Sequence, residues 1–156
     1  MRETSEIILQ GVRAALDDFA WHRIASPEAL NELRLGAMRR FLDDYENGQR
    51  DGRYVEASLP TLPFADGQFD LALVSHLLFL YSDQLSFEFH RAALDELWRV
   101  AREVRVFPLR ALGGKASPHL EPLVADWQGR SAKVEIMQVN YEFLKGANQM
   151  LRLSRD

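Results

Sequence analysis

The sequence predicts an α/β fold in which helices cover a mostly parallel sheet and an antiparallel hairpin closes one edge. The central observation is the segment 69–75, FDLALVS, where four apolar residues follow one another without alternation. Such a run, bounded here by the turn Ala65-Asp66-Gly67-Gln68, is typical of a strand buried on both faces, as in parallel sheets. Residues 133–143 and 148–153 alternate apolar and polar positions around Lys145-Gly146, which predicts the hairpin.

Length and composition are those of a single globular domain. The chain has 156 residues, of which 47% are hydrophobic, and a net charge of −4. The mild negative charge argues against a dedicated nucleic-acid surface, which is usually strongly basic. The absence of cysteine excludes disulfides and thiolate chemistry and fits a cytoplasmic protein. No long apolar stretch predicts a membrane helix, so we expect no membrane partner.

Residues 1–53 are expected to form a helical amino-terminal segment. Residues 5–20 carry apolar side chains at helical spacing. Ser26-Pro27-Glu28 predicts the start of a second helix, because Ser caps, Pro fits the first turn and Glu complements the helix dipole. Asn47-Gly48 is expected to end that helix.

Residues 54–156 are expected to form a partial α/β domain, within a single domain overall. Pro60 and Pro63 exclude a regular helix between its first two strands. Before the hairpin, the predicted elements are strands at 54–58, 69–75 and 104–107 and helices at 86–102 and 117–129.

His76 is the sharpest candidate for a catalytic residue. It directly follows the central strand, and ligands of open α/β sheets bind just past the carboxyl ends of their strands. A histidine there can act as a general base, or it can merely hydrogen-bond a neighbouring loop. No metal site is predicted, because His76, His90 and His119 lack the spacing of metal ligands.

The segment 55–76 resembles the middle of a class I S-adenosylmethionine-dependent methyltransferase. Leu62-Pro63-Phe64, Asp66-Gly67 and Phe69-Asp70 match that superfamily in order and spacing, and the resemblance extends over Glu96–Val100 and 103–109. It implies a Rossmann-like sheet with strand order 3-2-1-4-5-7-6, whose fourth strand is FDLALVS. It also implies methyl transfer from S-adenosylmethionine to an acceptor, either a small molecule or a macromolecule.

The resemblance also implies positions for the cofactor. Ser58 and Leu59 would lie at the adenine, where the family usually places an aspartate at the position of Ser58. A hydroxyl can accept the same hydrogen bond, but more weakly than a carboxylate. Ser75 and His76 would lie near the methionine end of the cofactor or the acceptor.

The glycine-rich turn of the superfamily is missing. No Gly-x-Gly precedes residue 54, and the residues ahead of it predict helices in place of a strand–helix–strand unit. We therefore expect an incomplete sheet, corresponding to the carboxy-terminal part of the family domain. The gap could be closed by the strand at 54–58, filled by another chain, or reflect a truncated sequence.

Two functions follow from these observations. One is a methyltransferase, whose binding of S-adenosylmethionine the missing turn puts in question. The other is a non-catalytic interaction or scaffold module that has lost cofactor binding. In either case an open sheet edge would favour a homo-oligomer.

Overall fold

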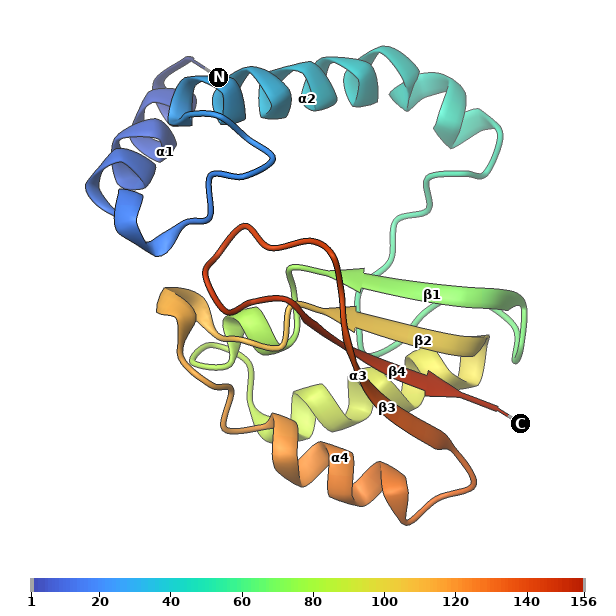
Figure 1. Cartoon of the computed structure of the whole chain (residues 1–156). Coiled ribbons are helices and arrows are strands. Elements are labelled where there is room, and N and C mark those ends of the chain that lie inside the picture. Colours follow the sequence, from blue (N-terminus) through green and yellow to red (C-terminus); the bar gives the residue numbers. More distant parts are fainter. Residues whose placement is uncertain (1, 156) are drawn as a thin grey trace. The chain divides into compact units, whose positions relative to one another are not determined.

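The computed structural model describes residues 2–155, and these form two compact units that meet along the chain between Glu56 and Ala57 (Figure 1). The first unit holds α1 (Arg2–Ala14), the short 3-10 helix η1 (Leu16–Asp18) and α2 (Pro27–Arg50). The second predicted helix is confirmed, while the first ends at Ala14 and does not continue to residue 20 as expected. No helix in the described part of the chain is both long and apolar enough to cross a membrane.

The start of α2 is as predicted and its end is not. Ser26 accepts a hydrogen bond from the backbone N–H of Ala29 at 3.2 Å, and Pro27 occupies the first turn. The helix passes through Gly48 and ends at Arg50, and the glycine with a left-handed backbone is Gly52, at φ 69°. The Asn47-Gly48 pair thus predicted the approximate position of the helix end but not its last residue, because glycine also tolerates a helical backbone.

The second unit is a four-stranded sheet with helices. Its strands take the spatial order β1-β2-β4-β3, with β1 parallel to β2 and the other two pairs antiparallel. In chain order the elements are β1 (Phe69–Ser75), η2 (Phe79–Tyr81), α3 (Phe87–Val100), β2 (Ala101–Phe107), η3 (Leu112–Gly114), α4 (Leu120–Gln128), β3 (Lys133–Gln138) and β4 (Gln149–Ser154). The predicted strand at 69–75 and the predicted hairpin are confirmed, but the strand lies at an edge of the sheet.

The sheet is mixed, so the expectation of a mostly parallel sheet is wrong for the described residues. The predicted strand at 54–58 does not form, and only an isolated bridge joins Ser58 to Thr61. Tyr54 instead belongs to the first unit. Its ring stacks on Tyr45 at 5.8 Å and its hydroxyl donates to Asp44 at 2.8 Å, which holds this segment against the end of α2.

The core of the second unit lies on one face of the sheet. Helices α3 and α4 pack against this face (Figure 1). The core is built from Val74, Leu78, Phe79, Ala93, Leu94, Leu97, Val104, Val106, Leu109, Leu123, Trp127, Leu151 and Leu153.

β1 is not buried on both faces as expected. Its side chains alternate, so Val74 points into the core while Leu71 and Leu73 are 41% and 69% exposed. The reason is its position, because β1 is an edge strand and α3 and α4 cover a single face.

Candidate functional site at the carboxyl end of β1

The carboxyl ends of β1 and β2 lie side by side because the two strands are parallel. Ser75, the last residue of β1, is in register with Phe107, the last of β2. The backbone N–H of His76 donates to the Phe107 carbonyl at 2.8 Å, which extends the pairing one residue past β1. The predicted candidates Ser75 and His76 therefore lie at the edge of the sheet where ligands bind in open α/β folds.

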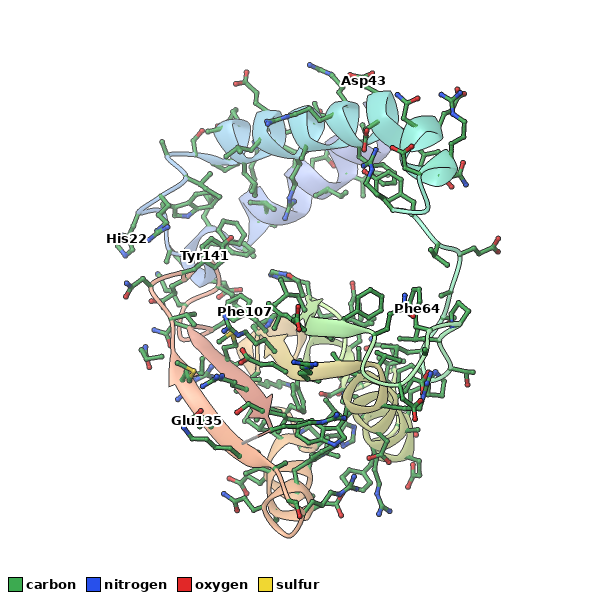
Figure 2. The ribbon with its side chains drawn as sticks, turned by 90° about the vertical axis from the view of Figure 1, so that its right-hand side faces the viewer. His22, Asp43, Phe64, Phe107, Glu135 and Tyr141 are labelled. Atoms are coloured by element: carbon green, nitrogen blue, oxygen red, sulfur yellow. The ribbon has the colours of Figure 1, made fainter. Side chains whose placement is uncertain are left out.

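Aromatic side chains surround this edge. The His76 ring lies 5.8 Å from the Phe107 ring in a T-shaped arrangement. Phe107 in turn contacts Tyr141, at 5.9 Å between ring centroids (Figure 2). Tyr141 comes from the long β3–β4 connection, which Figure 2 shows returning to the end of β2. Sequence reasoning did not single out Phe107 or Tyr141, whose pairing depends on this non-local return.

His76 has a left-handed backbone, with φ 55°, and is the one non-glycine residue with positive φ in the described part of the chain. This conformation costs an ordinary residue roughly 1–2 kcal/mol. Such outliers concentrate at functional sites, where the surrounding structure fixes a side chain in a required direction. At this turn the His76 ring lies beside the Phe107 ring at the end of β2.

The His76 ring also contacts its neighbour in the chain. Its Nδ1 lies 2.8 Å from the Ser75 hydroxyl. If the Ser75 hydroxyl donates, Nδ1 is the acceptor and the proton of the neutral ring is on Nε2. If the ring proton is on Nδ1, then Nδ1 donates and the Ser75 hydroxyl accepts. A neutral imidazole held by a serine in this way can take up one proton from a reacting group.

Ser58 and Leu59 lie on the segment before β1, within the second unit. The Ser58 hydroxyl is exposed and donates to the Leu59 carbonyl at 3.2 Å, so its lone pairs can still accept a hydrogen bond. Leu59 packs partly against the core. Ser58 and Leu59 thus combine an exposed hydroxyl with a half-buried apolar side chain.

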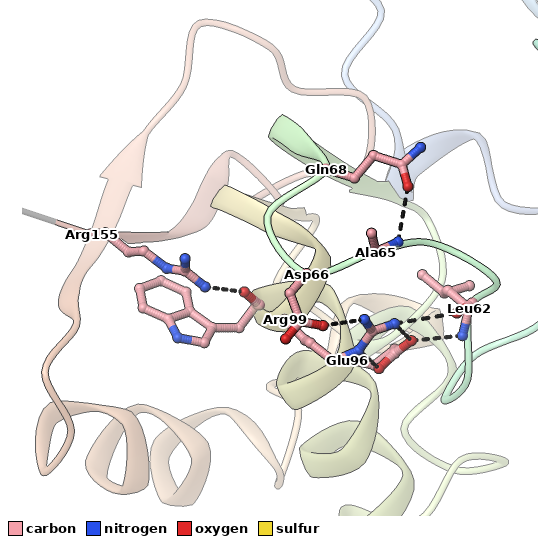
Figure 3. Close-up of polar contacts among 8 residues, drawn as sticks. Leu62, Ala65, Asp66, Gln68, Glu96, Arg99 and Arg155 are labelled. Carbon is pink, nitrogen blue, oxygen red and sulfur yellow. Dashed lines mark hydrogen bonds and ion pairs between the residues drawn. The ribbon is translucent and has the colours of Figure 1, made fainter.

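The loop that precedes β1 is fastened to α3 by a charged network (Figure 3). Glu96 accepts a hydrogen bond from the Leu62 backbone N–H at 2.7 Å. Arg99 pairs with Glu96 at 2.7 Å and reaches Asp66 at 2.6 Å, while its backbone carbonyl accepts from Gly67 N–H at 2.7 Å. These contacts hold the loop before β1 against α3.

The same network shifts the acidity of Glu96. Hydrogen bonds from the Arg99 guanidinium, and next from the Leu62 N–H, lower the pKa of Glu96 from 4.5 to about 2. Glu96 raises the pKa of Arg99 in return. Sequence reasoning missed this positioning role, although the i,i+3 spacing of Glu96 and Arg99 on a predicted helix is a visible signal for an ion pair.

No group of three potential metal-ligating side chains occurs within residues 2–155. Among the other candidates, His90 is buried in α3, and His119 is half-buried with its Nε2 3.2 Å from the Ser82 carbonyl. The turn after η2 lies over the His119 ring and accounts for its partial burial.

The family-model comparison matches a methyltransferase domain to residues 30–104, from α2 to β2. This match places residues 30–104 in the class I S-adenosylmethionine-dependent methyltransferase superfamily. The match includes Ser58, Leu59, Ser75 and His76 and both halves of the charged network in Figure 3. The sheet order β1-β2-β4-β3 is compatible with this superfamily, since it corresponds to strands 4-5-7-6 of the expected order.

One relative of this chain is an uncharacterized protein of Methanocaldococcus jannaschii. The two are 31% identical over 139 residues, which make up 89% of this chain and 60% of the relative. The chain thus spans about 60% of the length of the relative it matches. No solved structure matches the chain.

Proposed function

We propose that this chain is an S-adenosylmethionine-dependent methyltransferase that performs its chemistry at the carboxyl end of β1. The observation that carries the proposal is His76, which lies within the matched methyltransferase segment and has a constrained left-handed backbone at the end of the strand. Ser58 and Leu59 are proposed to hold the adenine, and Ser75 and His76 to face the methionine end and the acceptor.

The proposed cofactor supplies an electrophilic methyl group, and the protein positions the acceptor for in-line attack. An acceptor O–H or N–H attacks with its lone pair while the carbon–sulfur bond breaks and its electron pair stays on sulfur. The proton of the acceptor passes to the His76 imidazole, which acts as the general base. Ser75 holds the ring during this transfer through the contact at 2.8 Å. The acceptor is a small molecule or a macromolecule that presents such a nucleophile.

Calorimetry of the full chain with S-adenosylmethionine and S-adenosylhomocysteine tests the proposal. We expect binding tighter than about 1 mM, equivalent to ~4 kcal/mol. Ser58→Ala should weaken binding of both ligands, because the hydroxyl that accepts from the adenine is lost. Ser131→Ala, which removes an exposed hydroxyl from the loop before β3, is the matched control and should not change binding.

The second candidate is a non-catalytic module, which two observations favour. No Gly-x-Gly turn precedes residue 54, and β1 pairs on one side only within the described residues. A folded wild-type chain that binds neither ligand at millimolar concentration would support this module and contradict the methyltransferase activity.

A further inference from the structure

The two edges of the sheet differ in how they are protected. At the β3 edge, Lys133 and Glu135 form an ion pair at 3.1 Å, and Glu135 also pairs with Arg152 of β4 at 2.9 Å. At the β1 edge, the same open face carries the apolar side chains of Phe69, Leu71 and Leu73. Edge strands are normally guarded by charges, prolines or bulges, so the β3 edge is guarded and the β1 edge is not.

The free backbone groups of β1 belong to its odd-numbered residues. The N–H of His76 bonds to the Phe107 carbonyl, so even-numbered residues direct their backbone groups toward β2. Because these directions alternate along a strand, the N–H and C=O groups of Phe69, Leu71, Leu73 and Ser75 point away from the sheet. They form a continuous row of donors and acceptors along the outer edge.

We propose that β1 of a second copy of this chain pairs antiparallel with β1 about a two-fold axis at Ala72. Centring the pair on Ala72 sets Leu71 opposite Leu73 and Phe69 opposite Ser75 of the other copy. All four are odd-numbered, so each opposed pair can exchange both backbone hydrogen bonds. The register is therefore self-complementary in backbone bonding.

The side chains also match in this register. Leu71 and Leu73 oppose one another on the open face, which buries the most exposed leucines of β1. The one charged residue of β1, Asp70, lies opposite Val74 of the second copy and meets no like charge. A second copy is thus an occupant that the β1 edge itself specifies.

The pairing has a consequence for the candidate site. Antiparallel strands bring the carboxyl end of one β1 beside the amino end of the other. Phe69 of the second copy lies next to Ser75, and so adjoins the strand end that carries His76. The proposed dimer does not depend on cofactor binding, and its failure would leave the proposed methyltransferase function untouched.

Light scattering on the full chain measures the predicted assembly. We expect twice the mass of one chain for the wild type, and one chain for Leu73→Lys, which places a charge at the centre of the pairing. Met137→Lys, on the guarded β3 edge, is the matched control and should remain a dimer. A monomeric wild type, or a dimer that persists in Leu73→Lys, would overturn the proposal; circular dichroism checks that each variant is folded.

Disulfide trapping tests the register and does not depend on the behaviour of Leu73→Lys. The chain has no native cysteine, so a single introduced thiol reports one contact. Opposed residues at a two-fold axis have Cα atoms about 4.5 Å apart, within disulfide range, so Ala72→Cys should cross-link on oxidation. In Asp70→Cys the thiols of the two copies would lie four residues apart along the paired strands, about 13 Å, and should not cross-link. Equal cross-linking of both variants, or of neither, would contradict this register.

Discussion

Glu96 accepts a hydrogen bond from the backbone N–H of Leu62 at 2.7 Å, across 34 positions of the chain. The contact joins the two segments that resemble the methyltransferase family, the loop at 62–70 and the helical stretch Glu96–Val100. The two segments therefore meet at one joint between the loop before β1 and α3. The Glu96 side chain is 12% exposed, so this joint is largely shielded from water.

Loss of the Glu96 carboxylate should destabilise the second unit. In Glu96→Ala the Leu62 N–H and the Arg99 guanidinium lose their shared acceptor, which we expect to cost about 2 kcal/mol, as for other hydrogen bonds to charged groups. Urea unfolding at neutral pH measures the change. Asp70→Ala is the control, because Asp70 and Arg102 form an exposed pair at 3.9 Å, and its stability should equal that of the wild type. Equal stabilities of the two variants would contradict the role of Glu96.

The contribution of Glu96 should depend on pH. Its pKa is about 2 in the folded chain against an ordinary value of 4.5, so the unfolded chain binds the proton first. The stabilisation is complete above pH 4.5 and is lost as the pH falls toward 2. Glu96→Gln lacks this titration, so its stability deficit relative to the wild type should be smaller at pH 3 than at pH 7.

Urea unfolding of Glu96→Gln and the wild type at both pH values provides this comparison. Glu121→Gln, at an exposed position in the first turn of α4, controls for the loss of one carboxylate. A deficit for Glu96→Gln that stays constant or grows toward pH 3 would show that the carboxylate is not held by Arg99 and Leu62.

His76→Gly should be more stable than His76→Ala. Glycine adopts a left-handed backbone without a Cβ clash, so we expect a difference of about 1 kcal/mol between the two variants in urea unfolding. At the neighbouring Leu77, whose φ is not positive, alanine should be favoured over glycine. The same order at both positions would mean that the left-handed turn at His76 does not persist in solution.

The helices and strands of the second unit could largely be predicted, because a local sequence pattern indicates each of them. The run FDLALVS predicted β1 with its observed bounds, and alternation predicted the β3–β4 hairpin. The burial of β1 could not be predicted, since an apolar run specifies a strand but not the number of its neighbours. Tyr54 was mispredicted because its contacts with Tyr45 and Asp44 are tertiary and outweigh a weak strand preference.

The candidate site was predictable only in part. The position of His76 at the end of β1 follows from the sequence, because the strand boundary is local. Its left-handed backbone and its contact with Phe107 depend on how β1 and β2 end together. Ser58 and Leu59 stay predictions from the family resemblance.

His90 should make the stability of the second unit fall between pH 7 and pH 5. Its side chain is fully buried, and its Nδ1 donates to the Ser86 carbonyl at 2.8 Å. Within residues 2–155 its Nε2 makes no hydrogen bond, and burial in the core disfavours a charged ring. Burial lowers the pKa of His90 below 6.5, and the neighbouring His119 acts in the same direction, while the carbonyls of Ser86 and Leu78 oppose the shift without cancelling it.

Replacing His90 by leucine tests this pH dependence. Below pH 6.5 the unfolded wild type takes up a proton that the folded chain does not, so its stability decreases as the pH falls. His90→Leu removes this effect, and the backbone N–H of residue 90 still satisfies the Ser86 carbonyl at 3.1 Å. As the pH falls from 7 to 5, the free energy of unfolding should therefore decrease more for the wild type than for His90→Leu. His22→Leu, at an exposed histidine of the first unit, is the control and should show no such trend. If the stabilities of His90→Leu and the wild type changed in parallel with pH, a neutral buried His90 would be contradicted.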